Sequence, residues 1–171
     1  MWLGSIIRNH NCQDMNRKDV RQYTNVFESA VNSIDDLKKG YRKGLQALKG
    51  NSSKVSIKDS SKLLGSVDID ECTKSIYPQD SRWDFAIGYN QKAWFVEVHP
   101  ANTSNVKEMV KKVQWLEGWL VGKGKALANI RNDNFHYWIP SGRVCILKTS
   151  RQYKNLAEHK IQITPNPFVI K

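Results

Sequence analysis

Apolar residues recur every three or four positions between residues 16 and 50, which is the spacing of one face of a long amphipathic helix. Asn16 stands where an N-cap is expected, and Asp19 supplies negative charge to the first turn. Gly40 and Gly44 lower the helix propensity of the second half and permit a close neighbour. The pattern therefore predicts one long helix over residues 16–50.

Two short apolar runs, residues 83–88 and 93–99, flank a turn-prone Tyr-Asn-Gln sequence and predict a β-hairpin. Because strand side chains alternate in direction, Glu97 and His99 share one face with Phe95. The opposite face carries Trp94, Val96 and Val98. A hairpin register would bring the acid at the start of the first run, Asp84, beside Glu97 and His99.

The rest of the chain supplies further strands and two more helices. A helix begins at Thr103 or Ser104, and a basic helix covers residues 151–160. Strands are predicted at residues 55–57, 63–70, 135–139, 143–147, 161–163 and 168–170. Pro165 and Pro167 confine the last two to a sheet edge. The expected fold is α/β in the mixed sense: a central sheet flanked by helices, with additional strands at the C-terminus.

Trp115 and Trp119 lie four residues apart on one flank of the helix that follows residue 103. Such a pair favours packing against another element of the same chain. The alternative is a stacking or homodimer surface.

The bulk composition is that of one folded domain. A chain of 171 residues with 40% hydrophobic residues can bury one core and is too short for two. The three cysteines are far apart, which indicates reduced thiols and no disulfide framework. We expect a single domain over residues 1–171 in the cytoplasm, because no signal peptide or stretch of about 20 apolar residues is found.

The formal net charge of +11, from 27 Lys and Arg against 16 Asp and Glu, favours an anionic partner. We expect this partner to be nucleic acid. The basic residues predicted to contact its phosphates are Lys38, Lys39, Arg42, Lys43, Lys92, Lys111 and Lys112.

Asp84 and Glu97 supply the hard carboxylate oxygens that Mg²⁺ prefers, and a bound divalent cation can activate water and neutralise a phosphate oxygen. Asp70 or Glu71 is an alternative source of a further ligand, although such a close group of acids more often belongs to a solvated loop.

Asp84, Glu97 and His99, together with the order of the predicted helices and strands, resemble the motif and the element order of the PD-(D/E)XK nuclease superfamily. The resemblance covers residues 17–147. The resemblance implies a restriction-endonuclease-like fold with the order αβββαβ. It also implies a site in which Asp84 and Glu97 bind Mg²⁺ or Mn²⁺, and a substrate that is DNA more readily than RNA. His99 stands where the superfamily has a lysine.

An imidazole does not provide the permanent positive charge of a lysine. His99 would instead act as a general base or as a third metal ligand, the latter favouring Mn²⁺. Lys92 and Lys111 are candidates for a cation that has moved to a neighbouring element. We therefore expect a metal-dependent nuclease with Asp84, Glu97 and His99 as catalytic residues. The alternative is a nuclease-fold protein without catalysis that binds nucleic acid or a protein partner.

Overall fold

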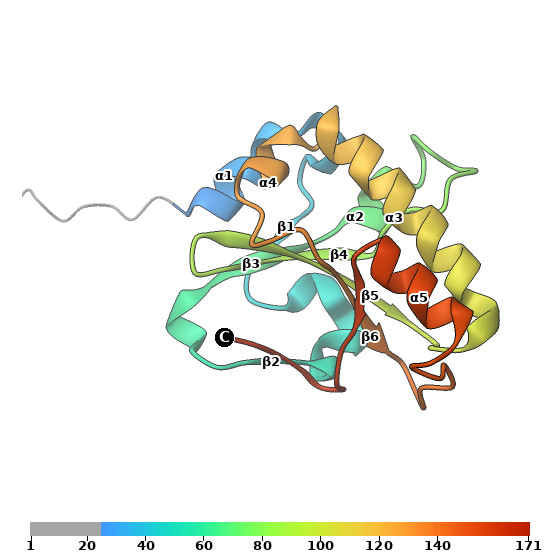
Figure 1. Ribbon diagram of the computed structural model, residues 1–171. Helices are drawn as coiled ribbons and strands as arrows, with labels where there is room; N and C mark the ends of the chain where they lie inside the picture. Colours follow the sequence, from blue (N-terminus) through green and yellow to red (C-terminus); the bar gives the residue numbers. More distant parts are fainter. Residues whose placement is uncertain (1–24) are drawn as a thin grey trace, which may run out of the picture.

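The computed structural model describes residues 25–171, and its centre is a six-stranded mixed sheet in the order β1-β3-β4-β5-β6-β7 (Figure 1). Along this order β1, β3, β4 and β5 pair antiparallel, whereas β5, β6 and β7 pair parallel. The bounds are β1 Tyr41–Arg42, β3 Leu63–Asp68, β4 Phe85–Tyr89, β5 Lys92–His99, β6 His136–Pro140 and β7 Ile161–Ile163. The mixed α/β class predicted from the sequence is confirmed.

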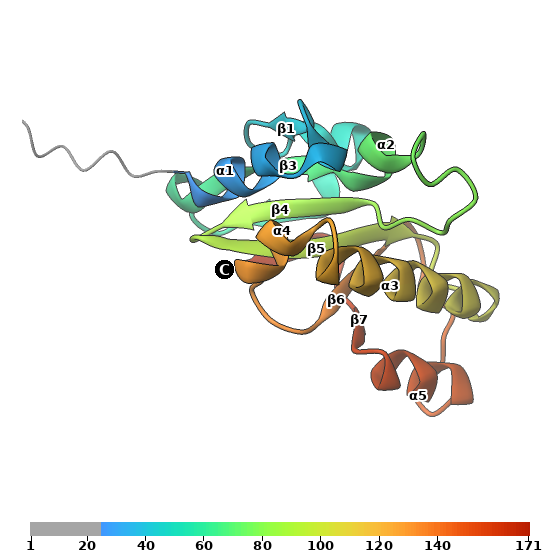
Figure 2. The ribbon, with the colours of Figure 1, turned by 90° about the horizontal axis from the view of Figure 1, so that it is seen from above.

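Helices cover one face of this sheet. The α-helices are α1 Val26–Ser33, α2 Ile69–Thr73, α3 Val106–Val121, α4 Lys125–Asn129 and α5 Arg151–Glu158. Their apolar side chains form the larger core, with Phe27, Met109 and Leu116 packed against the sheet residues Phe95 and Trp138. Figure 2 shows α3 and α4 running along the β4–β5 part of the sheet. None of the helices in the described part of the chain combines the length and the apolar character needed to span a lipid bilayer.

The opposite face of the sheet is covered by a small parallel pair of strands, β2 Val55–Ile57 and β8 Phe168–Ile170. A second apolar cluster forms between this pair and the sheet, with Ile170 against Ile87 and Val96. Burial of apolar side chains on both faces explains why β4 is buried along its whole length.

The β4–β5 hairpin matches the predicted pattern closely. Phe85 pairs with Val96, and Asn90 and Gln91 make the turn with positive φ angles of 48° and 63°. Phe95 packs in the helix-side core, whereas Trp94, Val96 and Val98 face the smaller apolar cluster, as the predicted alternation requires. The first strand is shorter than expected because it begins at Phe85.

Of the predicted long helix over residues 16–50, the described part is α-helical only over α1, and the prediction is wrong after Ser33. Asn25 caps α1 by accepting a hydrogen bond from Glu28 N at 3.0 Å, and the helix ends at Ser33 because Ile34 is extended. Lys39 and Lys49 have positive φ angles, which an α-helix does not tolerate. Two 3-10 segments, Asp35–Leu37 and Gln46–Lys54, flank β1 in place of a helix. The predicted N-cap Asn16 and the first-turn acid Asp19 lie outside the described residues.

The predicted strand over residues 143–147 is also wrong. This segment is an exposed connection between β6 and α5, held beside residues 101–102 by the hydrogen bond from Cys145 N to Ala101 O at 2.8 Å. Its single β-bridge joins Cys145 to Asn102. Only Ile146 of the segment is buried, so its apolar residues do not have the alternating burial that a half-buried strand requires.

Candidate active site

Asp84 and Glu97 lie side by side on the helix-covered face of the sheet. The backbone amide of Asp84 donates a hydrogen bond to Glu97 Oε2 at 2.9 Å, and the amide of Val98 donates to Asp84 Oδ2 at 3.1 Å. These two bonds follow from the hairpin register, in which Phe85 is opposite Val96. The backbone of each strand therefore holds the carboxylate of the other in a fixed orientation.

Lys112 completes this pair from α3. Its ammonium Nζ lies 2.6 Å from Glu97 Oε1 and 3.0 Å from Asp84 Oδ1. Only 13% of its side chain is exposed, against 0% for Glu97 and 20% for Asp84. Lys112 was predicted to contact phosphates together with Lys111, but in the structure its side chain turns inward onto the two acids. We call Asp84, Glu97 and Lys112 the carboxylate–lysine cluster.

A signal for Lys112 was present in the sequence. It follows the buried Met109 by three residues and precedes the buried Leu116 by four, so it lies close to the apolar stripe of α3. A lysine at such a position has to find a partner below the helix, because a buried unpaired charge is costly. Lys111 is displaced from this stripe and is exposed.

Burial dominates the electrostatics of the cluster. It raises the pKa of the Glu97 carboxyl well above its ordinary value, and the neighbouring charge of Asp84 raises it further, whereas the Lys112 ammonium opposes both effects. Burial by itself would lower the pKa of Lys112, but the two carboxylates overcome this and raise it. The ammonium is therefore the permanent positive charge of the site, and it opposes the protonation of Glu97 that burial and Asp84 favour.

His99 lies at the end of the same strand, next to the cluster but outside its contact network. In the described part of the chain its ring contacts the Asn105 side chain, with 3.3 Å between Nε2 and Nδ2. Burial and the positive charge of Lys112 lower the pKa of His99 from its ordinary value of 6.5, against the opposing charges of Asp84 and Glu108. The imidazole is therefore neutral at neutral pH, and the lone pair on Nε2, which accepts the hydrogen bond from Asn105 Nδ2, would have to leave this partner to take up a proton or bind a metal.

The other predicted phosphate-binding residues are dispersed. Lys92 begins β5 at the turn, five residues and about 17 Å from Glu97 along the strand. Lys38 forms an ion pair with Asp35 at 2.6 Å, and Arg42 belongs to the edge strand β1. Lys39 and Lys43 are exposed at the two ends of β1. These residues therefore lie on separate elements: the start of β5, the end of the 3-10 segment Asp35–Leu37, and the edge strand β1 with its flanks.

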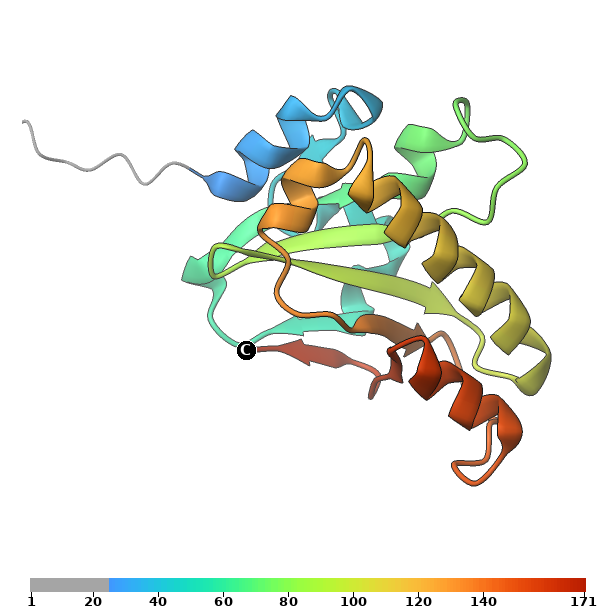
Figure 3. The same ribbon diagram turned by 45° about the horizontal axis from the view of Figure 1, so that its top comes forward.

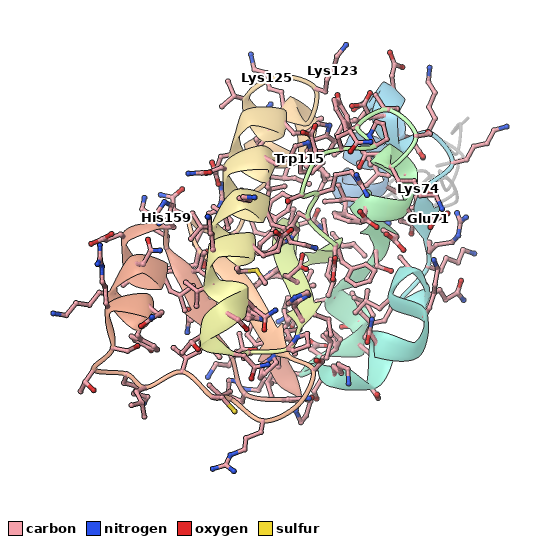
Figure 4. The ribbon with its side chains drawn as sticks, turned by 90° about the vertical axis from the view of Figure 1, so that its right-hand side faces the viewer. Glu71, Lys74, Trp115, Lys123, Lys125 and His159 are labelled. Carbon is pink, nitrogen blue, oxygen red and sulfur yellow. The ribbon has the colours of Figure 1, made fainter. Side chains whose placement is uncertain are left out.

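The acids considered as additional metal ligands have other partners. Asp70 accepts from Arg82 Nε at 2.9 Å, and Glu71 pairs with Lys74 at 2.8 Å. Figure 4 places Glu71 and Lys74 together on the outer side of α2, across from α3. Within residues 25–171 no group of three or more His, Cys, Asp or Glu side chains is arranged to hold a metal ion.

Two ligands of the cluster nevertheless suit a divalent cation. Asp84 Oδ1 and Glu97 Oε1 converge on one point, which is the point that the Lys112 ammonium contacts. Carboxylate oxygens are the preferred ligands of Mg²⁺ and also bind Mn²⁺. A cation bound to both oxygens would have to displace the ammonium, which would then stand beside the metal.

The tryptophan pair on α3 is part of the packing of the domain, as predicted. The rings of Trp115 and Trp119 stack with their centroids 5.9 Å apart, and Tyr77 meets Trp115 edge-on. Trp119 is 5% exposed, and its Nε1 donates a hydrogen bond to Asp36 at 2.9 Å. Figure 4 shows Trp115 between α3 and the segment that follows α2. This arrangement does not require a second copy of the chain.

Comparisons with known proteins leave the function to be inferred from this geometry. No protein-family model, curated protein or solved structure matches the chain.

Proposed function

We propose that the protein is a metal-dependent nuclease that hydrolyses phosphodiester bonds of DNA. The observation that carries the proposal is the convergence of Asp84, Glu97 and Lys112 from two paired strands and the helix that follows them. A pair of carboxylates beside one lysine is the set of groups that the resemblance to the PD-(D/E)XK superfamily implies. The lysine reaches this site from α3 instead of from the strand position of His99.

Asp84 and Glu97 would hold the Mg²⁺ or Mn²⁺ ion. When bound, the ion would lower the pKa of a water molecule and neutralise charge on the phosphate. The Lys112 ammonium, displaced from the carboxylates, would supply a positive charge to a phosphate oxygen and stabilise the charge that develops there. His99, which is neutral because of its lowered pKa, would accept a proton from the attacking water.

The substrate class follows from charge and from the resemblance. The excess of 11 positive charges favours a polyanion. DNA is the substrate that the superfamily resemblance favours over RNA.

Nicking of supercoiled plasmid DNA with Mn²⁺ or Mg²⁺ tests the proposal. The wild-type protein should nick the plasmid, and Asp84→Asn should reduce the rate at least about 100-fold, because an amide replaces a charged ligand. Asp59→Asn is the matched control, since Asp59 caps a 3-10 segment far from the cluster and asparagine is an equally good cap. A wild-type protein that does not nick the plasmid, or equal rates for wild type and Asp84→Asn, would contradict the proposal.

One observation favours a second candidate, a nuclease-fold protein without catalysis that binds nucleic acid or a protein partner. The Lys112 ammonium already satisfies both carboxylates, and Glu97 is fully buried. Such an ion pair can stabilise the fold without a metal ion or a substrate. Calorimetric titration with Mn²⁺ separates the two candidates, because the second predicts no heat of binding for the wild type or for Lys112→Met, in which the competing ammonium is absent.

A further inference from the structure

A groove is lined by residues of α5, of the N-terminal end of α3 and of the 3-10 segment that precedes α3. Figure 3 shows α5 beside this end of α3. The volume of the groove is about 570 Å³. It is lined by Thr103, Val106, Lys107, Arg151, Gln152, Lys154, Asn155 and Glu158. Most of these side chains are polar, so the groove is unlike an apolar pocket for a small molecule.

Among the described residues, the cations of the groove have no acidic partner. Lys107, Arg151 and Lys154 are exposed, and within residues 25–171 none of them forms an ion pair. The one acid in the lining, Glu158, is at the opposite end of α5 from Arg151. Thr103, Gln152 and Asn155 add neutral hydrogen-bond donors. Cations and neutral donors of these types are the side chains that contact phosphate oxygens in nucleic-acid complexes.

The groove and the carboxylate–lysine cluster both include a lysine from the N-terminal half of α3. Lys107 and Lys112 are five residues apart, so they point in directions about 140° apart around the helix. Asn105, which contacts His99, belongs to the short 3-10 segment Thr103–Asn105 whose first residue lines the groove. A strand of nucleic acid that crosses the N-terminal end of α3 would therefore meet both places.

We propose that this groove binds the phosphodiester backbone of the DNA strand about three nucleotides from the bond that is cut. The estimate comes from the 10–12 Å width of a helix with its side chains and the 3.4 Å rise per nucleotide of a strand. Lys107, Arg151 and Lys154 bind the phosphates, and Val106 forms the floor between them. This inference rests on the proposed nuclease function and relocates the nucleic-acid contact from residues 38–43 to α3 and α5.

The test is the salt dependence of binding to a 16-base-pair fluorescent DNA duplex without divalent metal, measured by anisotropy. The triple variant Lys107→Gln/Arg151→Gln/Lys154→Gln should flatten the slope of log K against log[salt] by about 2 to 3, since each lost phosphate contact removes about 0.9. The single variant Arg151→Gln should flatten it by about 1. The control Lys58→Gln/Lys125→Gln/Lys171→Gln removes three exposed charges elsewhere and should leave the slope within about 0.5 of the wild type.

The outcomes separate the groove from the nuclease function. Equal slopes for the groove variant and the control variant would overturn the groove while leaving DNA binding and plasmid nicking in place. A wild-type protein that binds the duplex without salt dependence would overturn both the groove and the proposed nucleic-acid substrate.

Discussion

Lys112→Met is expected to lower the free energy of unfolding by about 3–5 kcal/mol at pH 7.5, and to abolish plasmid nicking. The variant keeps the apolar stem of the side chain but leaves the fully buried carboxylate of Glu97 without its cation. Removal of one partner of a buried ion pair costs this much because the remaining charge has lost its solvation and its partner. Urea denaturation of the wild type and the variant measures the difference.

The cost should depend on pH with a defined sign. The pKa of Glu97 is already raised by burial above its ordinary value of 4.5, and loss of Lys112 raises it further. A carboxyl with a higher pKa in the folded state than in the unfolded state favours folding below about 4.5 and loses that contribution as the pH rises through the folded value. The deficit of Lys112→Met should therefore be largest at neutral pH and shrink to about 1–2 kcal/mol near pH 4.5, where the carboxyl is protonated.

Lys111→Met provides the stability control for this experiment. Lys111 is the neighbouring residue on α3 and is exposed, so its replacement should change the free energy of unfolding by less than about 0.5 kcal/mol. If Lys112→Met unfolds at the same urea concentration as Lys111→Met, the buried ion pair does not stabilise the fold as argued.

A second substitution should restore the stability lost in Lys112→Met. The double variant Lys112→Met/Glu97→Gln is expected to regain about 2–3 kcal/mol relative to the single variant, because a neutral amide has no charge to bury. Its oxygen can accept the hydrogen bond that Asp84 N now donates to Glu97 Oε2, and its amide nitrogen can donate to Asp84 Oδ1. Despite its restored stability, the double variant should not nick DNA, because it has lost both a metal ligand and the ammonium.

A double-mutant cycle gives the coupling energy between Lys112 and Glu97 directly. Its four proteins are the wild type, Lys112→Met, Glu97→Gln and the double variant. Additive losses, with the double variant less stable than either single variant, would show that the two side chains act independently. That result is incompatible with a 2.6 Å contact between a fully buried carboxylate and a largely buried ammonium.

The sequence predicted the part of the site that depends on local pairing. The β4–β5 hairpin has alternating residues and a turn, and both signals act within a few residues. Because the turn sets the register, the contact between Asp84 and Glu97 followed once the hairpin was predicted. The closing strand β7 at the edge of the sheet was predictable from the prolines that follow it.

The long helix failed for a physical reason. An interval of three or four residues between apolar positions fits an α-helix, but it also fits short 3-10 segments and turns whose apolar residues reach one core. Leu37 and Leu48 are both buried, each from a different 3-10 segment. The breaks occur at Lys39 and Lys49, whose positive φ angles are not expected from lysine. Tertiary packing, which the local pattern does not contain, decided the conformation there.

Lys112 was assigned to the wrong surface because its partners are 15 and 28 residues away in sequence. Its place beside the apolar stripe of α3 was visible, but the direction of a long side chain depends on the sheet below the helix. The groove between α3 and α5 could not be predicted from the sequence either. It forms only where Lys107 lies beside a helix that begins more than 40 residues later.

X-ray diffraction at the manganese absorption edge, from crystals grown with Mn²⁺, tests the carboxylate–lysine cluster as a metal site most directly. We predict an anomalous peak bonded to Asp84 Oδ1 and Glu97 Oε1, with the Lys112 ammonium moved off these oxygens. Absence of the peak, with Lys112 Nζ still in contact with both carboxylates, would contradict the metal-dependent mechanism.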